Sequence, residues 1–408
     1  MTNYTKAAHL DTVSYEIRGE IAQRSKDLKE QGYNIIELNI GNPAIFRFRT
    51  PETMSRAIIM NMDKSEGYSD SQGIFPAREA IVMETQNIGI KGVDIDHVFI
   101  GNGVSELIMI CAEALLNPGD EILLPCPDYP LWTAAVKICG GRAVYYNCDE
   151  TNSWYPDVEH IKANITNRTR AIVLINPNNP TGAVYPKEIL EEIIDIARKN
   201  KLVIFSDEIY HRILYNGAKR YHIATMCDDV LIVTLNGLSK NYRACGYRVG
   251  WAIISGPVKN ALDYLDGLRL LSSMRLCSNV MGQWAVQTAL GGYQSVNELT
   301  EKGGRLFNQM NFAYEALNQI EHIKCVKPQG AIYLFPEYDP EYFDFKNDKE
   351  FALQFLEEYH VLVVPGSGFN FNNRTCFRMT FLPFQDTLQI AMDRLAQFLN
   401  KHLIKKKG

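Results

Sequence analysis

Residues 171–182 read AIVLINPNNPTG, and residues 202–210 read LVIFSDEIY. Residues 230–240, VLIVTLNGLSK, show the same pattern, in which a mostly apolar run of four to six residues ends abruptly in polar ones. Apolar runs without alternation are typical of strands that are buried on both faces of a parallel sheet. These three stretches therefore predict neighbouring strands at the centre of an α/β fold.

The segments on either side extend this pattern. Helices are expected at residues 104–116 and from about 186 to 200, where apolar residues recur with helical spacing. Further apolar strands are expected at residues 98–100, 121–124, 142–148 and 251–254. Strands that alternate with helices indicate a large α/β domain whose mostly parallel sheet is flanked by helices.

The two ends of the chain show a different pattern. Residues 12–31 are expected to form one amphipathic helix, and residues 306–319 another. Short strands are expected at residues 331–335, 361–364 and 376–381. We therefore predict a large α/β domain over residues 60–290. Residues 1–59 and 291–408 would fold together as a smaller α+β domain.

Composition excludes several classes of protein. The formal net charge of −5 disfavours nonspecific binding to nucleic acid. No stretch is apolar and long enough to span a membrane, and the first residues lack the apolar core of a signal peptide. Nine cysteines include no CxxC pair, so no metal site is expected. Reduced cysteines in a cytoplasmic protein fit this pattern.

Polar residues follow each of the central strands, and parallel sheets bind ligands beyond the carboxyl ends of their strands. Gly103 precedes the expected helix at 104–116, so backbone N–H groups there can hold a phosphate. Arg248 can add a bidentate cation to the same anion.

The other strand ends supply groups of different chemistry. Asp207 can keep a ring nitrogen protonated, and Lys240 offers an amine for an imine. Asn179 and Tyr210 can donate hydrogen bonds to a phenolic oxygen. Each residue alone has an ordinary interpretation as a turn, a helix cap, a surface lysine or half of a salt bridge. Together, in this order, they predict a site for pyridoxal phosphate.

At this point the sequence resembles a known family. Residues 176–182 and 206–210, Ser239-Lys240 and residues 246–250 resemble the fold-type-I, class I/II aminotransferases over almost the whole chain. Residues 15–19 and 38–43 look most like the bacterial glutamate–pyruvate (alanine) aminotransferases. The resemblance implies the type I fold of PLP-dependent transferases.

The resemblance also implies roles for further residues around the cofactor. Val104 and Ser105 would complete the phosphate cup, with a weaker contribution from Ser239. Tyr129 would stack on the cofactor ring. Tyr68 would reach the phosphate of a neighbouring subunit, which implies a homodimer with shared active sites. Relatives often carry Ser or Thr three residues before the lysine, whereas this chain has Gly237.

A third group of residues is implied for the substrate. Arg378 lies within an apolar strand, where a charge needs a partner, and the family's partner is the substrate α-carboxylate. A buried salt bridge is the alternative. Gly41 and Asn179 would lie against that carboxylate. Apart from the resemblance, an enzyme that accepts both alanine and glutamate could use a mobile arginine, and Arg18, beside Tyr15, is our candidate for it. A solvated charge on a helix is the alternative for Arg18.

The predicted reaction is transamination, most simply L-alanine and 2-oxoglutarate to pyruvate and L-glutamate. Lys240 would act as the proton-transfer base and acid, with Asp207 and Tyr210 as the other catalytic residues. An aromatic or other aminotransferase, or a carbon–sulfur lyase, would share the cofactor residues. A noncatalytic cofactor-binding regulator would carry an added DNA-binding module, and a plain α/β binding module would hold no cofactor.

Overall fold

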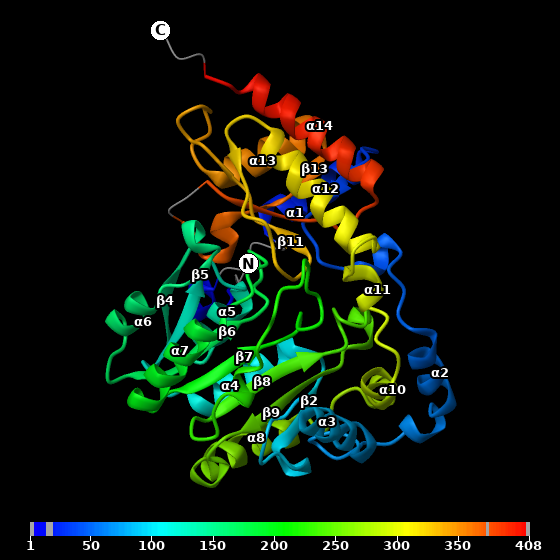
Figure 1. The fold of residues 1–408 in the computed structure, drawn as a ribbon, viewed down its shortest axis with the longest axis vertical. Coiled ribbons are helices and arrows are strands. Elements are labelled where there is room, and N and C mark those ends of the chain that lie inside the picture. Colours follow the sequence, from blue (N-terminus) through cyan, green and yellow to red (C-terminus); the bar gives the residue numbers. More distant parts are fainter. Residues whose placement is uncertain (1–3, 14–18, 373–374, 405–408) are drawn as a thin grey trace.

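A computed structural model describes residues 4–13, 19–372 and 375–404. An eight-stranded sheet, ordered β2-β9-β8-β7-β6-β3-β4-β5, forms its centre (Figure 1). The strands are β2 (Val98–Gly101), β3 (Glu121–Cys126), β4 (Arg142–Asp149), β5 (Tyr155–Pro156), β6 (Thr169–Ile175), β7 (Val203–Asp207), β8 (Ile232–Gly237) and β9 (Gly250–Ser255). Strands β8, β7, β6, β3 and β4 are parallel, whereas β9 and β5 pair antiparallel with their neighbours. The prediction of a mostly parallel sheet is confirmed.

Helices cover both faces of this sheet, which explains why its strands are apolar without alternation. Ile172 and Leu174 pack into one core, while Val173 and Ile175 pack into the core on the opposite face. The first face is covered by α2 (Glu52–Met60), α3 (Phe75–Asn87), α6 (Val158–Ala163), α7 (Lys187–Asn200) and α10 (Ala285–Gly291). The short helix α9 (Val280–Gln283) contacts α2 and α10. The second is covered by α4 (Val104–Leu115), α5 (Pro130–Ile138) and α8 (Leu262–Met274).

The two chain ends share a third core. Ile21 and Leu28 from the N-terminal part pack with Leu306 and Phe398 from the C-terminal part. The helices of this region are α1 (Glu20–Glu30), α11 (Asn297–Thr300), α12 (Arg305–Gln319), α13 (Asp348–Tyr359) and α14 (Gln385–Lys401). Its short strands are β1 (Ile36–Glu37), β10 (Ile323–Lys324), β11 (Tyr333–Leu334), β12 (Glu337–Tyr338), β13 (Val361–Leu362), β14 (Val364–Pro365) and β15 (Phe377–Thr380). The smaller α+β unit is thus confirmed, while its boundaries at residues 60 and 290 stay a prediction.

Some expected elements of this smaller unit were wrong. The helix expected over residues 12–31 begins only at Glu20, because Gly19 is extended and Val13 ends a 3₁₀ turn over Ala8–Thr12. Glycine is the natural place for such a boundary, since it costs about 1 kcal/mol more than alanine inside a helix. The strand expected at 361–364 is two strands, since β13 pairs with β1 and β14 with β15. The strand expected at 331–335 shrinks to β11, because Ala331 has a positive φ of 59°.

The cysteines are thiols, as the sequence analysis expected. All nine cysteines are free thiols, and Cys111, Cys148, Cys325 and Cys376 are buried. Within residues 4–13, 19–372 and 375–404, no helix has the length and apolar character needed to cross a bilayer.

Candidate active site

A cavity of about 910 Å³ lies between the carboxyl ends of the central strands and the core shared by the chain ends. This volume is at the upper end of the range for small-molecule sites. Both regions contribute side chains, so the site forms only when the chain ends fold onto the sheet. Of the predicted residues, the cavity is lined by Gly41, Val104, Ser105, Tyr129, Asn179, Asp207, Tyr210, Ser239, Lys240, Arg248 and Arg378.

Asp207, the last residue of β7, presents a buried carboxylate to this cavity. Its Oδ2 accepts a hydrogen bond from Trp132 Nε1 at 3.4 Å, and its Oδ1 accepts one from the Ile209 N–H at 3.3 Å. Burial raises the pKa of the carboxyl group to about 6, and no cation among the described residues pairs with it. An anion kept in this setting calls for a cationic partner from a ligand.

Lys240 lies in the loop that follows β8 and its side chain reaches the same cavity. Nζ donates a hydrogen bond to the Gly41 carbonyl oxygen at 2.6 Å and lies 3.8 Å from Cys245 Sγ. Neither contact is an acidic group, so the amine is held without an ion pair in the described residues. An amine held this way can exchange its hydrogen bonds for a covalent bond with a carbonyl group.

Val104, Ser105 and Arg248 form a part of the cavity wall that is suited to an anion. Helix α4 begins directly after Gly103, whose φ is +85°. The Arg248 guanidinium donates to the Cys245 and Asn102 carbonyl oxygens, both at 3.0 Å. A Cβ added at Gly103 would lie 2.5 Å from Arg248 Nη2, so glycine is what lets the cation approach the helix N-terminus. Backbone N–H groups and a guanidinium together form a phosphate cradle.

Gly237, the position where relatives often have a hydroxyl, is tightly enclosed. A Cβ there would lie 2.7 Å from the Val249 carbonyl oxygen and 3.0 Å from Gly250 Cα. A serine at this position would have to displace the backbone of β9. Among the described residues, Ser105 and Ser239 are the serines that line the cavity.

Arg378, in β15, is a buried cation without a carboxylate partner among the described residues. It is 2% exposed, and its Nε has no hydrogen-bond partner. Nη1 donates to Asn179 Oδ1 at 3.0 Å, and Nη2 donates to the Asn39 carbonyl oxygen. The salt bridge considered as an alternative is thus not present in the described part of the chain. A buried guanidinium that is left unpaired is costly unless an anionic ligand binds it.

Tyr210 follows β7 and faces a second phenol. Its hydroxyl lies 3.0 Å from that of Tyr333. Burial raises the pKa of Tyr210 well above its usual value, so the group keeps its proton for hydrogen bonding. Tyr129 lines the cavity from the N-cap position of α5.

Comparison with known proteins agrees with this geometry. Residues 33–395 match the model of the family described as aminotransferase class I and II. The chain belongs to the class I and II aminotransferases. It is 51% identical to glutamate-pyruvate aminotransferase AlaA of Haemophilus influenzae, over 98% of this chain and 100% of that one. It is 47% identical to alanine aminotransferase of Mycobacterium bovis, over 97% and 92% of the two chains. A crystal structure of an Escherichia coli aminotransferase superposes with a TM-score of 0.97 at 48% identity, covering 99% and 100% of the chains.

Class I and II aminotransferases use pyridoxal phosphate to act on amino acids and 2-oxo acids, and the residues of this cavity fit that cofactor. The Gly103–Arg248 cradle suits its phosphate, and Asp207 suits a protonated ring nitrogen. Lys240 is the amine that fits its aldehyde. When bound, pyridoxal phosphate supplies an electron sink for negative charge on the substrate Cα.

Of the residues expected in the aminotransferase site, Tyr68 lies outside the cavity, and two others cannot be placed. Tyr68 is 81% exposed and does not line the cavity of its own chain. Tyr15 and Arg18 lie outside the described residues.

Three residues that line or support the cavity were not found from the sequence. Tyr333 and Cys245 line it, and Trp132 donates to Asp207. Trp132 lies three residues after Tyr129, close to one helical turn, so it could have been suspected once Tyr129 was chosen. Tyr333 lies in an apolar stretch with no polar cluster around it, and only the pairing of β11 with β15 brings it to the site.

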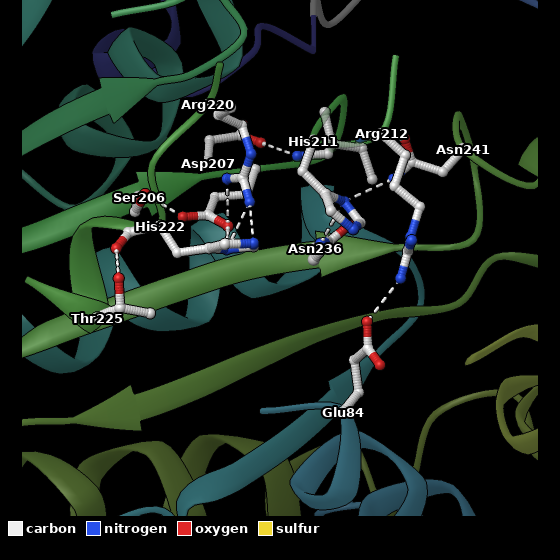
Figure 2. A network of polar contacts seen from close by, with 12 residues as sticks. Glu84, Ser206, Asp207, His211, Arg212, Arg220, His222, Thr225, Asn236 and Asn241 are labelled. Atoms are coloured by element: carbon white, nitrogen blue, oxygen red, sulfur yellow. Dashed lines mark hydrogen bonds and ion pairs between the residues drawn. The ribbon is translucent and has the colours of Figure 1, made fainter. Parts of the chain in front are cut away.

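Behind Asp207, on the other face of the sheet, lies a network of charged and polar groups (Figure 2). Glu208 is 1% exposed and pairs with Arg220 at 2.7 Å and with His222 at 2.8 Å. Burial opposes ionisation of Glu208, but attraction to Arg220 and His222 outweighs it and lowers the carboxyl pKa. His211 Nδ1 lies 2.8 Å from the amide nitrogen of Asn236, and burial lowers the pKa of this imidazole well below its usual value. These contacts hold the end of β7, which carries Asp207, against residues on the opposite face of the sheet.

Proposed function

We propose that this aminotransferase transfers the amino group of L-alanine to 2-oxoglutarate, giving pyruvate and L-glutamate. The observation that supports a substrate with an α-carboxylate is Arg378, a buried guanidinium that lacks a carboxylate partner in the described residues and lines the cavity. An α-carboxylate is the bidentate anion such a group binds best. The two amino acids are taken from the names of the relatives with 47–51% identity.

The division of labour follows from position in the cavity. Asp207 would hold the ring nitrogen protonated, and Asn179 and Tyr210 would donate to the ring oxygen. Tyr129 would pack against the ring. Lys240, once released from the cofactor, would act as the base that takes the proton from the substrate Cα. It would then act as the acid that gives the proton back later in the reaction.

The remaining contacts belong to the two ends of the ligands. Gly103, Val104, Ser105 and Arg248 would bind the phosphate, with Ser239 beside them. Gly41 and Asn179 would lie against the α-carboxylate held by Arg378. The Asn179 side chain already contacts Arg378, which supports a shared role.

Tyr15 and Arg18 remain our candidates for contact with the substrate side chain. Arg18 would pair with the distal carboxylate of glutamate and move away for the methyl group of alanine. We expect Arg18→Ala to lower kcat/KM for glutamate and 2-oxoglutarate at least tenfold more than for alanine, since a charge-assisted hydrogen bond is worth roughly 1.5–3 kcal/mol. Equal losses for both would exclude the role.

We further propose a homodimer in which Tyr68 completes the neighbouring site. Large apolar side chains are exposed in the segment that precedes Tyr68, such as Met60 at 78%, and at the end of α8, where Met274 is 73% exposed. Ser71, close to Tyr68, contacts Ser273 at the end of α8, so these side chains belong to one region of the surface. An extensive exposed apolar surface of this kind is typical of a subunit interface.

Subunit mixing tests the shared site directly. Tyr68→Ala and Lys240→Ala variants should each have low activity alone. A heterodimer refolded from both would contain one site with neither defect, so activity should return to roughly half of that of the wild type. Absence of recovery in a verified heterodimer would contradict a site shared through Tyr68.

The reaction itself is tested with substrates. Purified holoenzyme should convert pyruvate and glutamate to alanine and 2-oxoglutarate, while an aromatic donor or cystathionine should react far more slowly. Borohydride should fix the chromophore to Lys240, and Lys240→Ala should fold but lose turnover. Faster release of a thiol from cystathionine, or faster transfer from tyrosine, would replace the proposed substrate with one of those alternatives.

Two broader expectations stay with this proposal. Residues 60–290 would form the cofactor domain, with the chain ends as the smaller one, and limited proteolysis near those boundaries would test it. The nine free thiols fit the reducing cytoplasm. Fractionation of the native cells would test that compartment.

A further inference from the structure

Tyr333 touches three groups that our proposed function places at the reacting centre. It is 3% exposed, and β11 brings it beside β15, where Tyr333 pairs with Thr380 two residues from Arg378. Its ring centroid lies 4.2 Å from Arg378 Cζ. Its hydroxyl lies 3.0 Å from that of Tyr210.

The hydroxyl of Tyr333 also lies against the backbone of Gly41. A Cβ at Gly41 would be 1.9 Å from the phenolic oxygen, so any larger residue there would push Tyr333 away. The Gly41 carbonyl oxygen in turn accepts the hydrogen bond of Lys240. Tyr333 therefore contacts residues that the proposed function places beside the cofactor, and also residues that it places beside the substrate carboxylate.

The 3.0 Å contact between the two phenols allows either hydroxyl to donate, and a cofactor bound to Tyr210 would decide between them. Each hydroxyl has one proton, and the hydrogen bond between Tyr210 and Tyr333 uses one of the two. If Tyr210 spends its proton on the ring oxygen of the cofactor, Tyr333 must donate to the Tyr210 oxygen. A hydroxyl that accepts a hydrogen bond is a stronger donor, because the two bonds polarise each other.

We propose that Tyr333 is a positioning residue with two functions, which rest on the function proposed above. Its hydroxyl orients and strengthens the Tyr210 donor toward the cofactor oxygen. Its ring face holds the Arg378 guanidinium so that the edge of the cation stays available for the substrate carboxylate. The alternative is that the ring of Tyr333 only fills space in the core, and that its hydrogen bond to Tyr210 has no effect on the cofactor.

Tyr333→Phe tests the first function, because it removes the hydroxyl and keeps the ring. The readout is the pH midpoint at which the visible absorbance of the bound cofactor changes. A weaker donor stabilises the anionic ring oxygen less, so the midpoint should rise by roughly 0.5 to 1 unit, the shift that corresponds to one weakened hydrogen bond. A residue with only a packing role would leave the midpoint unchanged, and that result would overturn the proposal.

A double-mutant cycle shows whether the effect passes through Tyr210. Tyr210→Phe should raise the midpoint more than Tyr333→Phe does. In the Tyr210→Phe background, adding Tyr333→Phe should shift it by less than about 0.2 unit, because the mediating hydroxyl is gone. Additive shifts would show that Tyr333 does not act through Tyr210.

Tyr338 provides a matched control. It is a fully buried tyrosine in β12 of the same core, and its hydroxyl has no hydrogen-bond partner among the described residues. Tyr338→Phe should leave the midpoint within the error of the wild type. A shift equal to that of Tyr333→Phe would indicate a general loosening of the core and would count against the proposal.

The second function is tested by binding of glutarate, a dicarboxylate that cannot react. Tyr333→Phe should keep the dissociation constant within about twofold, whereas Tyr333→Leu, which lacks the aromatic face, should weaken binding roughly tenfold, a typical effect of one buried cation–π contact. Tyr333→Leu also lacks the hydroxyl and must show the same midpoint shift, so the test does not depend on one variant. Equal glutarate binding by all three proteins would remove the second function.

The outcomes separate this inference from the function on which it rests. If the wild-type protein bound no chromophore or transferred no amino group, the proposed function would be wrong. If it did both and Tyr333→Phe left the midpoint unchanged, only the role of Tyr333 would be wrong.

Discussion

Asp207 and Glu208 are adjacent carboxylates on one strand end, and they have opposite surroundings. Successive side chains of a strand point to opposite faces. Asp207 faces the cavity without a cation among the described residues, and burial raises its pKa to about 6. Glu208 faces the other way, and its pKa is lowered because Arg220 and His222 outweigh the cost of burial. A buried charge with its own partners maintains the fold, whereas one without them marks the place of a ligand.

The largest expected effect comes from removing the unpaired charge. Asp207→Asn should lower kcat/KM by at least about 10³-fold, the size expected for a group that stabilises charge in the transition state. The apo protein should stay folded, since no ion pair between described residues is lost. Steady-state kinetics with alanine and 2-oxoglutarate, together with thermal unfolding of the apo protein, would check both halves. Near-normal turnover by this variant would break the comparison.

Removing the paired charge should do the reverse. Glu208→Gln leaves Arg220 buried without its carboxylate, which typically costs about 3–5 kcal/mol of unfolding free energy. The fraction that stays folded should keep the visible absorbance of bound cofactor, because Glu208 faces away from the cavity. Urea unfolding and absorbance spectra measure the two properties. An unchanged stability would show that Arg220 and His222 find other partners.

The two carboxylates should also give opposite pH dependences of apo-protein stability. The folded pKa of Asp207, about 6, exceeds its ordinary value, so its stabilising contribution is present below about pH 4 and is lost as the pH rises through 6. The loss amounts to at most about 3 kcal/mol for a shift of roughly two units. The pKa of Glu208 is lowered, so its stabilising contribution is present at pH values above the ordinary pKa of a glutamate. This contribution is lost as the pH falls.

Urea unfolding of apo wild type and apo Asp207→Asn at pH 4.5 and pH 8 would detect this difference. The unfolding free energy of the variant should rise relative to that of the wild type when the pH is raised from the lower to the higher value. A constant difference would mean that Asp207 is not destabilised by burial.

The smallest expected effect concerns the phosphate end. Gly237→Ser should cost about 1–3 kcal/mol of stability, as overpacked substitutions do, because the Val249 carbonyl oxygen occupies the space of the new Cβ. It should not tighten binding of pyridoxal phosphate, despite the added hydroxyl. Thermal unfolding and cofactor titration would show it. Tighter binding with unchanged stability would mean that the backbone of β9 moves to admit the side chain.

Much of the site could be predicted because its residues follow apolar strands. Asp207, Lys240 and Asn179 stand where a parallel sheet delivers polar groups to one edge, so their convergence needed no coordinates. Tyr333 could not be found in this way, because nothing in its own stretch separates it from a core residue. The helix expected at residues 12–31 failed for a related reason, since an apolar stripe does not show that the helix begins only after Gly19.

The sequence by itself determined the class of fold and the family, because periodicity and short polar motifs are local properties of the chain. Only the tertiary structure decided which charges are left without internal partners. Among the described residues, Arg378 and Asp207 have no oppositely charged partner, whereas Glu208 pairs with Arg220 and His222. Partnership between buried charges depends on distance in space, which local spacing does not encode.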